Sequence, residues 1–478
     1  MKGLHVDRRG LLLAALALPI VSVPSYAQQE PETSNDAAAA LPDRGPSFET
    51  TRGLLAERID SGRDSVGYVT LIRDADGPRL VTYGTADELN SHPLDGDTVF
   101  EIGSITKVFT ALLLADMVAR GEVALTDPVT KYLPPEGRPK SFDGKSISLL
   151  DLATYTSGLP RMPTNFIPWD EANPYAHYTV PQLYRFLSEF TPQYYPGSHY
   201  EYSNLGFGLL GHVLSLRAGR NYQDLVTARI CEPLGLKDTR ITLSSAMRER
   251  LAQGHDTSLL AVPGWDLPTL AGAGALRSTA NDMMRFLNAC QGKQKTDVSP
   301  AIASLLEVRR QTNENGVYAA AGWFVETAHN DELVMKDGGT GGYASFIGYS
   351  TRTGIAAVLL SNTAGWSATP PLGRHLLNPN FPLPTLHRQV AIDPAKLAAY
   401  AGRYPLTPRF VLTVMPRNGH LIVQATGQSE YEAFPESDTR FFFRVVDARI
   451  TFELASDGTA SALVLHQNGR DRWGVRLP

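Results

Sequence analysis

The sequence predicts an α+β fold that is followed by a small antiparallel β domain. Helical spacing near the start, at Leu54, Leu55, Arg58 and Ile59, precedes two extended runs, at 66–72 and around 80–83, with turn-forming residues between them. From about residue 110 to 283 the patterns are mostly helical, and strand character returns at 333–335, 345–349 and 355–360. Strands on either side of a helical middle favour α+β layering over a doubly wound parallel sheet.

The C-terminal part of the chain has a different texture. Residues 366–392 are proline-rich with little periodicity, which is typical of a linker. Beyond them, in 393–478, several short strand-like runs lie beside Asn-Gly and Asp-Gly turn formers; these runs are 410–415, 420–425, 441–446, 450–454 and 462–466. This pattern predicts a small antiparallel barrel or sandwich. It carries no catalytic constellation, so we expect an accessory domain that packs against the catalytic one or gates its substrate.

Residues 1–27 have the order of an export signal. The Arg8-Arg9 pair precedes the apolar run 11–18, and Ser25-Tyr26-Ala27 offers small residues for cleavage after Ala27. The arginine pair fits a twin-arginine signal and an ordinary one equally well. The run is too short to span a membrane, so we expect a periplasmic or secreted protein without a stable membrane span. Residues 28–47 are expected to be a tether.

Composition excludes several classes of function. The 478 residues carry 44 Lys and Arg against 49 Asp and Glu, and this net charge of −5 without a basic block argues against nucleic acid as a partner. Two cysteines, Cys231 and Cys290, cannot form a disulfide scaffold. We expect them to be free buried thiols, although the sequence leaves a pairing open. None of the 11 His is followed by Glu, and we expect neither a metal nor another cofactor.

The candidate chemistry begins at Ser104, which lies three residues before Lys107. The apolar run 108–119 that follows is apolar nearly all round, which indicates a buried central helix. Ser104 would lie in its first turn, where free N–H groups favour a developing anion. Burial weakens the hold of a lysine on its proton, so Lys107 is a candidate base for the Ser104 hydroxyl. Although a lone S-x-x-K is a weak signal, this lysine is the only one of 10 with Ser at that position.

Two later motifs strengthen the case. Tyr202-Ser203-Asn204 is the only Y-x-N in the chain. The run Lys336-Asp337-Gly338-Gly339-Thr340-Gly341-Gly342 follows a predicted strand, and its glycines allow a ligand to approach the backbone closely. The G-x-G-x-x-G run 206–211 lacks a preceding strand, so we interpret it as helix packing rather than a dinucleotide site.

Together the three motifs resemble those of the penicillin-recognising serine hydrolases, in the same order and at similar separations. The resemblance is to the branch of class C β-lactamases, D-alanyl-D-alanine carboxypeptidases and related esterases. It covers about residues 48–365, where the stretches 149–160, 202–211, 232–239 and 278–286 agree as well. It implies a β-lactamase-like catalytic domain, with an antiparallel sheet flanked by helices and a helical subdomain. The tail resembles, more weakly, the small barrel appended to some members.

The resemblance also implies roles for individual residues. Ser104 would be acylated, and Lys107 and Tyr202 would share the proton transfers. Asn204 would orient Lys107 and the substrate amide, and Lys336, followed by Gly338, would supply positive potential. The backbone N–H groups of Ser104 and Gly339 would form the oxyanion hole, where loss of one donor typically costs about 3–4 kcal/mol of barrier.

One departure bears on the substrate. Relatives usually have Thr or Ser between the Lys and Gly of the third motif, where this chain has Asp337. A carboxylate there would repel an anionic substrate terminus within about 8–10 Å. The expected function is hydrolysis of β-lactams or of D-amino-acid peptides of the cell wall through an acyl-enzyme. The alternatives are a small-ester or amide hydrolase and a β-lactam sensor that stays acylated.

Overall fold

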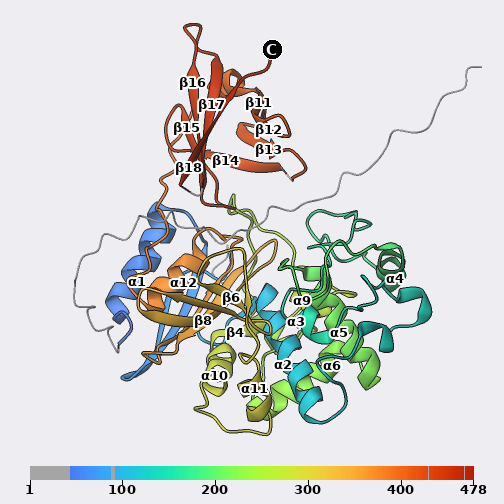
Figure 1. Cartoon of the computed structure of the whole chain (residues 1–478). Coiled ribbons are helices and arrows are strands. Elements are labelled where there is room, and N and C mark those ends of the chain that lie inside the picture. Colours follow the sequence, from blue (N-terminus) through green and yellow to red (C-terminus); the bar gives the residue numbers. More distant parts are fainter. Residues whose placement is uncertain (1–43, 88–91, 429, 468) are drawn as a thin grey trace, which may run out of the picture.

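The chain folds into a larger α+β part and a smaller β part that lies above it in Figure 1. The computed structural model describes residues 44–87, 92–428, 430–467 and 469–478. The export signal predicted at 1–27 and most of the tether predicted at 28–47 lie outside the described residues. No helix within these ranges is long and apolar enough to cross a membrane.

An eight-stranded antiparallel sheet forms the centre of the larger part. Its strands run in the order β2-β1-β10-β9-β8-β7-β6-β5, so the first hairpin pairs with a strand nearly 300 residues later, with Val69 opposite Leu360. The strands predicted from 66, 80, 333, 345 and 355 are all present. The strands are β1 (Gly67–Asp74), β2 (Gly77–Gly84), β5 (Arg310–Gln311), β6 (Val317–Ala319), β7 (Phe324–Ala328), β8 (Asp331–Gly339), β9 (Ala344–Ser350) and β10 (Ala356–Ser361).

Helices cover both faces of this sheet. Because alternate residues of a strand face opposite sides, β9 directs Phe346 against Gly373 of α12 (Thr369–Leu377). It directs Tyr349 to the other face, where Tyr349 contacts Trp323, which in turn stacks on Phe286 of α10 (Ala280–Cys290). The N-terminal helix α1 (Phe48–Ala56) packs against β2.

The predicted central helix is α2 (Thr106–Ala119), in which every residue from 106 to 117 is buried. It packs against α5 (Asn204–Ala218), α9 (Ala271–Gly274) and α11 (Ser299–Ser304), the first two of which lie beside it in Figure 1. A short antiparallel pair, β3 (Val99–Glu101) with β4 (Arg277–Thr279), leads the chain into α2. The remaining helices are α3 (Leu149–Ala153), α4 (Val180–Glu189), α6 (Tyr222–Val226), α7 (Glu232–Leu234) and α8 (Ser245–Glu249).

Part of the predicted linker is helical. Residues 369–377 of the stretch 366–392 form α12, so the assignment of that whole stretch to a linker is wrong. Two prolines lie in the first turn of this helix, where a missing N–H costs nothing. Leu372, Leu376 and Leu377 are buried, and the helix packs against β8, β9 and β10.

The smaller part is a nearly closed eight-stranded antiparallel barrel. The strands β11 to β18 pair in sequence order, and the ends meet where the N–H of Leu477 donates to the carbonyl of Arg403 (2.8 Å). A separate core contains Tyr404, Phe441 and Ile450. The turn at Asn418-Gly419 has two positive φ angles, 53° and 81°, which those residues tolerate. The strands are β11 (Gly402–Thr407), β12 (Phe410–Arg417), β13 (His420–Ala425), β14 (Glu430–Pro435), β15 (Arg440–Phe442), β16 (Ala448–Leu454), β17 (Ala460–Gln467) and β18 (Arg470–Val475), and the 3-10 helix η6 (Pro394–Tyr400) precedes them.

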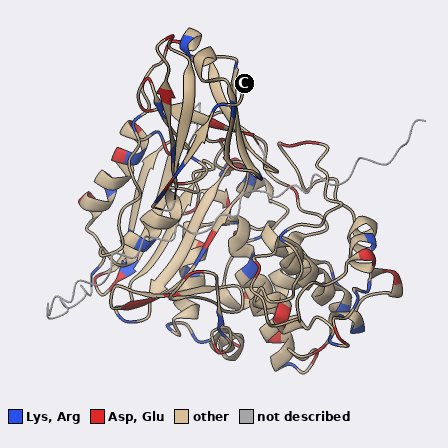
Figure 2. Cartoon of the chain, turned by 45° about the horizontal axis from the view of Figure 1, so that its top comes forward, with Lys and Arg blue, Asp and Glu red and all other residues tan. Residues whose placement is uncertain are grey.

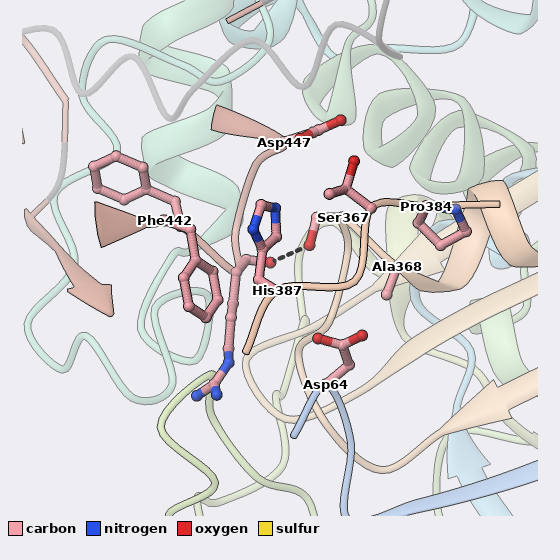
Figure 3. A pocket seen from close by; sticks show the side chains of 10 residues that line it. Asp64, Ser367, Ala368, Pro384, His387, Phe442 and Asp447 are labelled. Atoms are coloured by element: carbon pink, nitrogen blue, oxygen red, sulfur yellow. Dashed lines mark hydrogen bonds between the residues drawn. The ribbon is translucent and has the colours of Figure 1, made fainter. Parts of the chain in front are cut away.

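The two parts meet at a polar contact that we call the domain junction, formed by Arg58, Asp64, Ser367 and Arg444. The guanidinium of Arg58 pairs with Asp64 (3.3 Å). Arg444 of the barrel donates to the carbonyl of Thr257 (2.9 Å), and the Ser367 hydroxyl donates to the Arg444 carbonyl (2.8 Å). The latter bond is the dashed line in Figure 3, which shows a pocket at this contact with Asp64 and Ser367 on its wall.

Charged residues of both signs are distributed over the whole fold. Figure 2 shows Lys and Arg interspersed with Asp and Glu on both parts of the molecule. Cys231 and Cys290 are free thiols; Cys231 is buried and Cys290 half-buried.

Candidate active site

Ser104 lies in a tight turn between β3 and α2. The turn is the 3-10 segment η2 (Gly103–Ile105), which continues directly into α2. Gly103 has a φ of +47°, and a Cβ there would lie 2.5 Å from the backbone N of Gly339. Only glycine allows this approach, so the sequence at 103 brings the Ser104 turn against the end of β8. Ser104 is half-buried within an otherwise buried turn.

Lys107 is completely buried one turn above Ser104. Its Nζ donates to Ser104 Oγ (2.8 Å) and to the carbonyl of Ala273 in α9 (2.6 Å). Burial lowers the pKa of Lys107 to about 8, because desolvation disfavours the charged amine; neighbouring Lys336 adds to this effect and Tyr202 opposes it. A base beside a hydroxyl, with a pKa near neutrality, is suited to accept the hydroxyl proton.

The phenol of Tyr202 is surrounded by positive charge. The Nζ atoms of Lys107 and Lys336 lie 5.1 and 5.2 Å from the centre of its ring, and the guanidinium carbon of Arg161 lies 5.1 Å from it. We call Tyr202 and these three cations the Tyr202 cluster. Burial opposes ionisation of the phenol, but the charges of Lys107 and Lys336 outweigh it and lower the pKa of Tyr202 to about 8. Tyr155, which stacks on Tyr202 at 4.9 Å, holds the ring in place.

Asn204 lies at the start of α5, which Ser203 caps through a bond from the N–H of Gly206 (2.8 Å). The amide of Asn204 donates to the hydroxyl of Tyr175 (3.1 Å), and its Oδ1 is buried without a partner. The family resemblance implies that Asn204 orients Lys107. Among the hydrogen bonds of the described residues, however, Lys107 has none to Asn204. Its second hydrogen bond, besides the one to Ser104, goes to the Ala273 carbonyl. The free Oδ1 leaves Asn204 able to accept a bond from a substrate amide.

Lys336, Gly338 and Gly339 lie at the end of β8, where this strand extends past β7. The N–H of Thr340 donates to the Tyr343 carbonyl (3.0 Å). Because bonded pairs alternate along an antiparallel ladder, the N–H of Gly339 is directed away from β9. Gly338 packs so tightly on the Ser104 turn that a Cβ would lie 2.9 Å from Ser104 N. The N–H groups of Ser104 and Gly339 therefore border the same space.

Asp337 remains close to the cations. Its Oδ1 lies 3.5 Å from Nζ of the buried Lys336. In the β8–β9 register it is opposite Phe346, which places it on the α12 face of the sheet. Burial disfavours its ionisation, but Lys336 and Arg374 outweigh this and hold the pKa of Asp337 below its ordinary value. The carboxylate is thus charged at neutral pH and offsets part of the Lys336 charge.

Three contributors to this site were not predicted from the sequence. Arg161 follows directly on the matching stretch 149–160, and a lone arginine between Leu-Pro and Met-Pro was a signal available there. Tyr155 has a positive φ of 58° and is 1% exposed, a conformation that no sequence pattern indicated. The Ala273 contact is made by a carbonyl, which every residue has, so no residue type marks it.

A hydroxyl, an amine and a phenol with lowered pKa values, and two backbone N–H groups are the components of nucleophilic acyl transfer. Within the described ranges, no three His, Cys, Asp or Glu side chains are grouped so that they would hold a metal ion. Neither Ser104, Lys107 nor Tyr202 lines the pocket at the domain junction.

Comparison with known proteins agrees with this arrangement. Residues 55–377 match the family model described as beta-lactamase. The chain belongs to the β-lactamase family. The predicted family and α+β fold are confirmed, and the protein is a serine hydrolase of the β-lactamase and D-alanyl-D-alanine carboxypeptidase type.

The matches to individual relatives extend over most of the length of each relative. The D-alanyl-D-alanine-carboxypeptidase/endopeptidase AmpH of Escherichia coli K12 is 28% identical over 74% of this chain and 91% of its own. Penicillin-binding protein 4* of Bacillus subtilis 168 is 26% identical over 83% of this chain and 91% of its own. Among solved structures, a β-lactamase/D-alanine carboxypeptidase of Pseudomonas syringae has a TM-score of 0.59 at 23% identity, covering 70% of this chain and 97% of that one. At that identity the last comparison supports the fold alone.

The barrel matches a different family. Residues 386–476 match one described as a domain of unknown function (DUF3471).

Proposed function

We propose that this protein is an exported hydrolase that forms an acyl-enzyme on Ser104 with β-lactams or with D-amino-acid peptides of the cell wall. One observation carries the proposal: Ser104 Oγ lies 2.8 Å from the amine of a fully buried lysine whose pKa is lowered to about 8. Nucleophilic catalysis needs such an activated hydroxyl.

In the proposed reaction, Ser104 Oγ attacks the substrate carbonyl while its proton passes to Lys107 or Tyr202. The negative oxygen of the tetrahedral intermediate accepts bonds from the N–H groups of Ser104 and Gly339. When the C–N bond breaks, the leaving nitrogen receives a proton from Tyr202 or Lys107. In a β-lactam this nitrogen stays attached through the opened ring, and in a peptide it departs. Water then attacks the ester, and the same groups carry the protons in reverse.

The substrate class rests on the relatives. Relatives of this chain are named as a D-alanyl-D-alanine-carboxypeptidase/endopeptidase, a penicillin-binding protein and β-lactamases. The site agrees with substrates that carry a carboxylate, because the Tyr202 cluster has three cations against one close carboxylate, Asp337.

Intact-mass spectrometry tests the proposal. The protein is mixed separately with a penicillin, an N-acylated D-alanyl-D-alanine peptide and a short p-nitrophenyl ester, and mass and product are followed over time. We expect a transient adduct or turnover with the penicillin or the peptide. Ser104→Ala abolishes it, while Ser188→Ala, at a half-buried serine of α4 whose hydroxyl donates to the Arg185 carbonyl, leaves it unchanged. Reaction of Ser104→Ala at the wild-type rate contradicts the proposal.

A second function, hydrolysis of small esters, is favoured by Asp337. Its charge 3.5 Å from Lys336 Nζ weakens the attraction for an anionic substrate. Turnover of the ester, with none of the penicillin or the peptide, would establish this alternative and overturn the first. A penicilloyl adduct that persists for hours without product would instead indicate a sensor.

Export is a separate part of the proposal. If residues 1–27 are a signal, the mature protein recovered from the producing cells begins at Gln28. An intact N-terminus on active protein in the cytoplasm contradicts it.

A further inference from the structure

Arg161 connects the start of α5 to the Tyr202 cluster. Its carbonyl accepts hydrogen bonds from the N–H groups of Asn204 (3.0 Å) and Leu205 (3.1 Å). These groups lie in the first turn of the helix, where an N–H has no partner within the helix itself. Its side chain lies over Tyr202, with the guanidinium carbon 5.1 Å from the centre of the ring. The backbone of Arg161 is thus fixed by the helix, whereas its side chain faces the candidate active site.

The three cations of the Tyr202 cluster differ in their partners. Lys107 donates to Ser104 and to the carbonyl of Ala273, and Lys336 lies beside Asp337. Within the described ranges, the guanidinium of Arg161 makes neither a hydrogen bond nor an ion pair, and its Nε is buried without a partner. Contact with a ring face satisfies a cation only partly, by about 0.5–2 kcal/mol.

Buried polar groups are paired in nearly all cases. Six other described arginines have a buried Nε without a hydrogen bond, but five of them, Arg444 among them, are held through another nitrogen or an ion pair. Arg161 and Arg310 are not, and of these two only Arg161 lies over Tyr202.

The centre of the ring over which Arg161 lies is also 5.1 Å from Nζ of Lys107, the amine that donates to Ser104. A planar guanidinium matches a carboxylate with two parallel hydrogen bonds, which a lysine amine does not. Since Asp337 already offsets part of the Lys336 charge, Arg161 is the cation left for an anionic group.

We infer that Arg161 binds the carboxylate of the substrate and makes this enzyme selective for anionic substrates. The inference rests on the proposed function of the site. It assigns to Arg161 a contact that the third motif, with Asp337 in place of a hydroxyl residue, is poorly suited to make. Arg161 is then a specificity-determining residue whose removal affects substrates according to their charge.

The test compares one penicillin with the same penicillin whose carboxylate is converted to a carboxamide. The second-order rate of Ser104 acylation is measured for both by intact mass, in wild type, Arg161→Leu and Arg161→Lys. Arg185→Leu on α4, at an exposed arginine, is the control for the change in net charge. Relative to Arg185→Leu, we expect Arg161→Leu to lower the acylation rate about 10- to 100-fold for the penicillin with the carboxylate. For the carboxamide, the rate should fall less than threefold.

The ratio of the two rates separates binding from activation. The Arg161 charge also lowers the pKa values of Lys107 and Tyr202, but loss of that effect slows both substrates alike and cancels in the ratio. Arg161→Lys keeps the positive charge but cannot form two parallel hydrogen bonds to a carboxylate. Its ratio of the carboxylate rate to the carboxamide rate should therefore lie between those of wild type and Arg161→Leu.

An equal loss with both substrates overturns the inference and leaves the proposed function intact. If the wild-type protein reacts with neither penicillin, the same comparison is made by the rate of product release from an N-acylated D-alanyl-D-alanine peptide and from its C-terminal carboxamide. Reaction with none of the four compounds refutes the proposed function itself. A melting temperature close to that of wild type for Arg161→Leu, since the capping carbonyl is unchanged, excludes unfolding as the cause of any loss.

Discussion

The Tyr202 cluster and the domain junction both contain cations that are buried or half-buried, and they differ in how those cations are partnered. At the junction, Arg444 is 4% exposed and both of its terminal nitrogens donate, to the Thr257 carbonyl (2.9 Å) and to Gln389 Oε1 (3.1 Å). In the Tyr202 cluster, Arg161 has no such partner among the described residues and Asn204 Oδ1 is free. Partnered charge holds two parts of a fold together, whereas charge left without partners is available to a substrate.

The two regions also differ in whether their buried cations can lose a proton near neutral pH. Burial lowers the pKa of Arg444 to about 10, which leaves it charged at neutral pH. Burial lowers the pKa of Lys107 to about 8, within reach of neutrality. The same physical cause therefore produces a permanent charge at the junction and a usable base in the cluster. Changes at matched positions in the two regions test this difference.

The largest effect is expected at Lys107. Replacement by Met removes the base beside Ser104 and lowers kcat/KM by about 10³-fold, within the range that general bases contribute. The melting temperature should not fall, because a desolvated amine is removed and an apolar side chain of similar length fills its place. Steady-state kinetics and thermal unfolding check both statements. A variant with activity within tenfold of wild type would show that Lys107 is not the base.

The matched change at the junction is Arg444→Met. It removes two hydrogen bonds that the charged guanidinium donates, and the free energy of unfolding should fall by roughly 2–4 kcal/mol, as measured by denaturant titration. Folded protein should keep kcat/KM within about twofold. Loss of activity without loss of stability would instead place the barrel in the reaction.

The pH dependence of kcat/KM should respond to changes in the Tyr202 cluster and not to changes at the domain junction. Because Lys107 and Tyr202 have pKa values lowered to about 8 and the base must be unprotonated, kcat/KM for a neutral ester should rise about tenfold per pH unit below pH 7 and level off above pH 8. Lys336→Met removes a positive charge that lowers both pKa values, so the profile should move to higher pH. Arg444→Met should leave the midpoint in place. A flat wild-type profile between pH 6 and 8 contradicts this assignment.

The smallest effect is expected at Asp337. Replacement by Asn removes the carboxylate 3.5 Å from Lys336 Nζ and preserves the side-chain shape. We expect kcat/KM to rise about threefold for an anionic substrate and to stay unchanged for its neutral analogue, since the pair is partly open to water. Kinetics with both substrates measure the difference. A fall for the anionic substrate would mean that the Asp337 carboxylate positions Lys336 rather than opposing the substrate.

Sequence reasoning located the main elements where residue type dictates structure. The run 108–119 is apolar on every side and forms the buried helix α2. Elements whose formation depends on packing against the rest of the fold were not predicted. Three of the six residues of β18 are charged and five are exposed, so no alternation of apolar and polar residues marks that strand. The strands β11 and β14 were missed as well, and the prolines of α12 concealed a helix.

For the candidate site, the three motifs supplied Ser104, Lys107, Tyr202 and Lys336, which the structure brings together. The contacts that complete it were not predictable, because they join distant segments through the backbone or through ring stacking. The Ala273 carbonyl comes from a segment 166 residues beyond Lys107. Arg161 is identified only by its place over Tyr202 and by the absence of a partner within the described ranges.

The most direct test is to locate the covalent adduct. Protein exposed briefly to a penicillin is quenched in acid and digested with trypsin, which releases residues 80–107 as one peptide. That peptide should gain the full mass of the penicillin, because ring opening expels no atoms, and fragmentation should place the gain on Ser104. An adduct on any other residue, or a peptide 80–107 that stays unmodified while the penicillin is hydrolysed, would contradict the claim that the Tyr202 cluster activates Ser104.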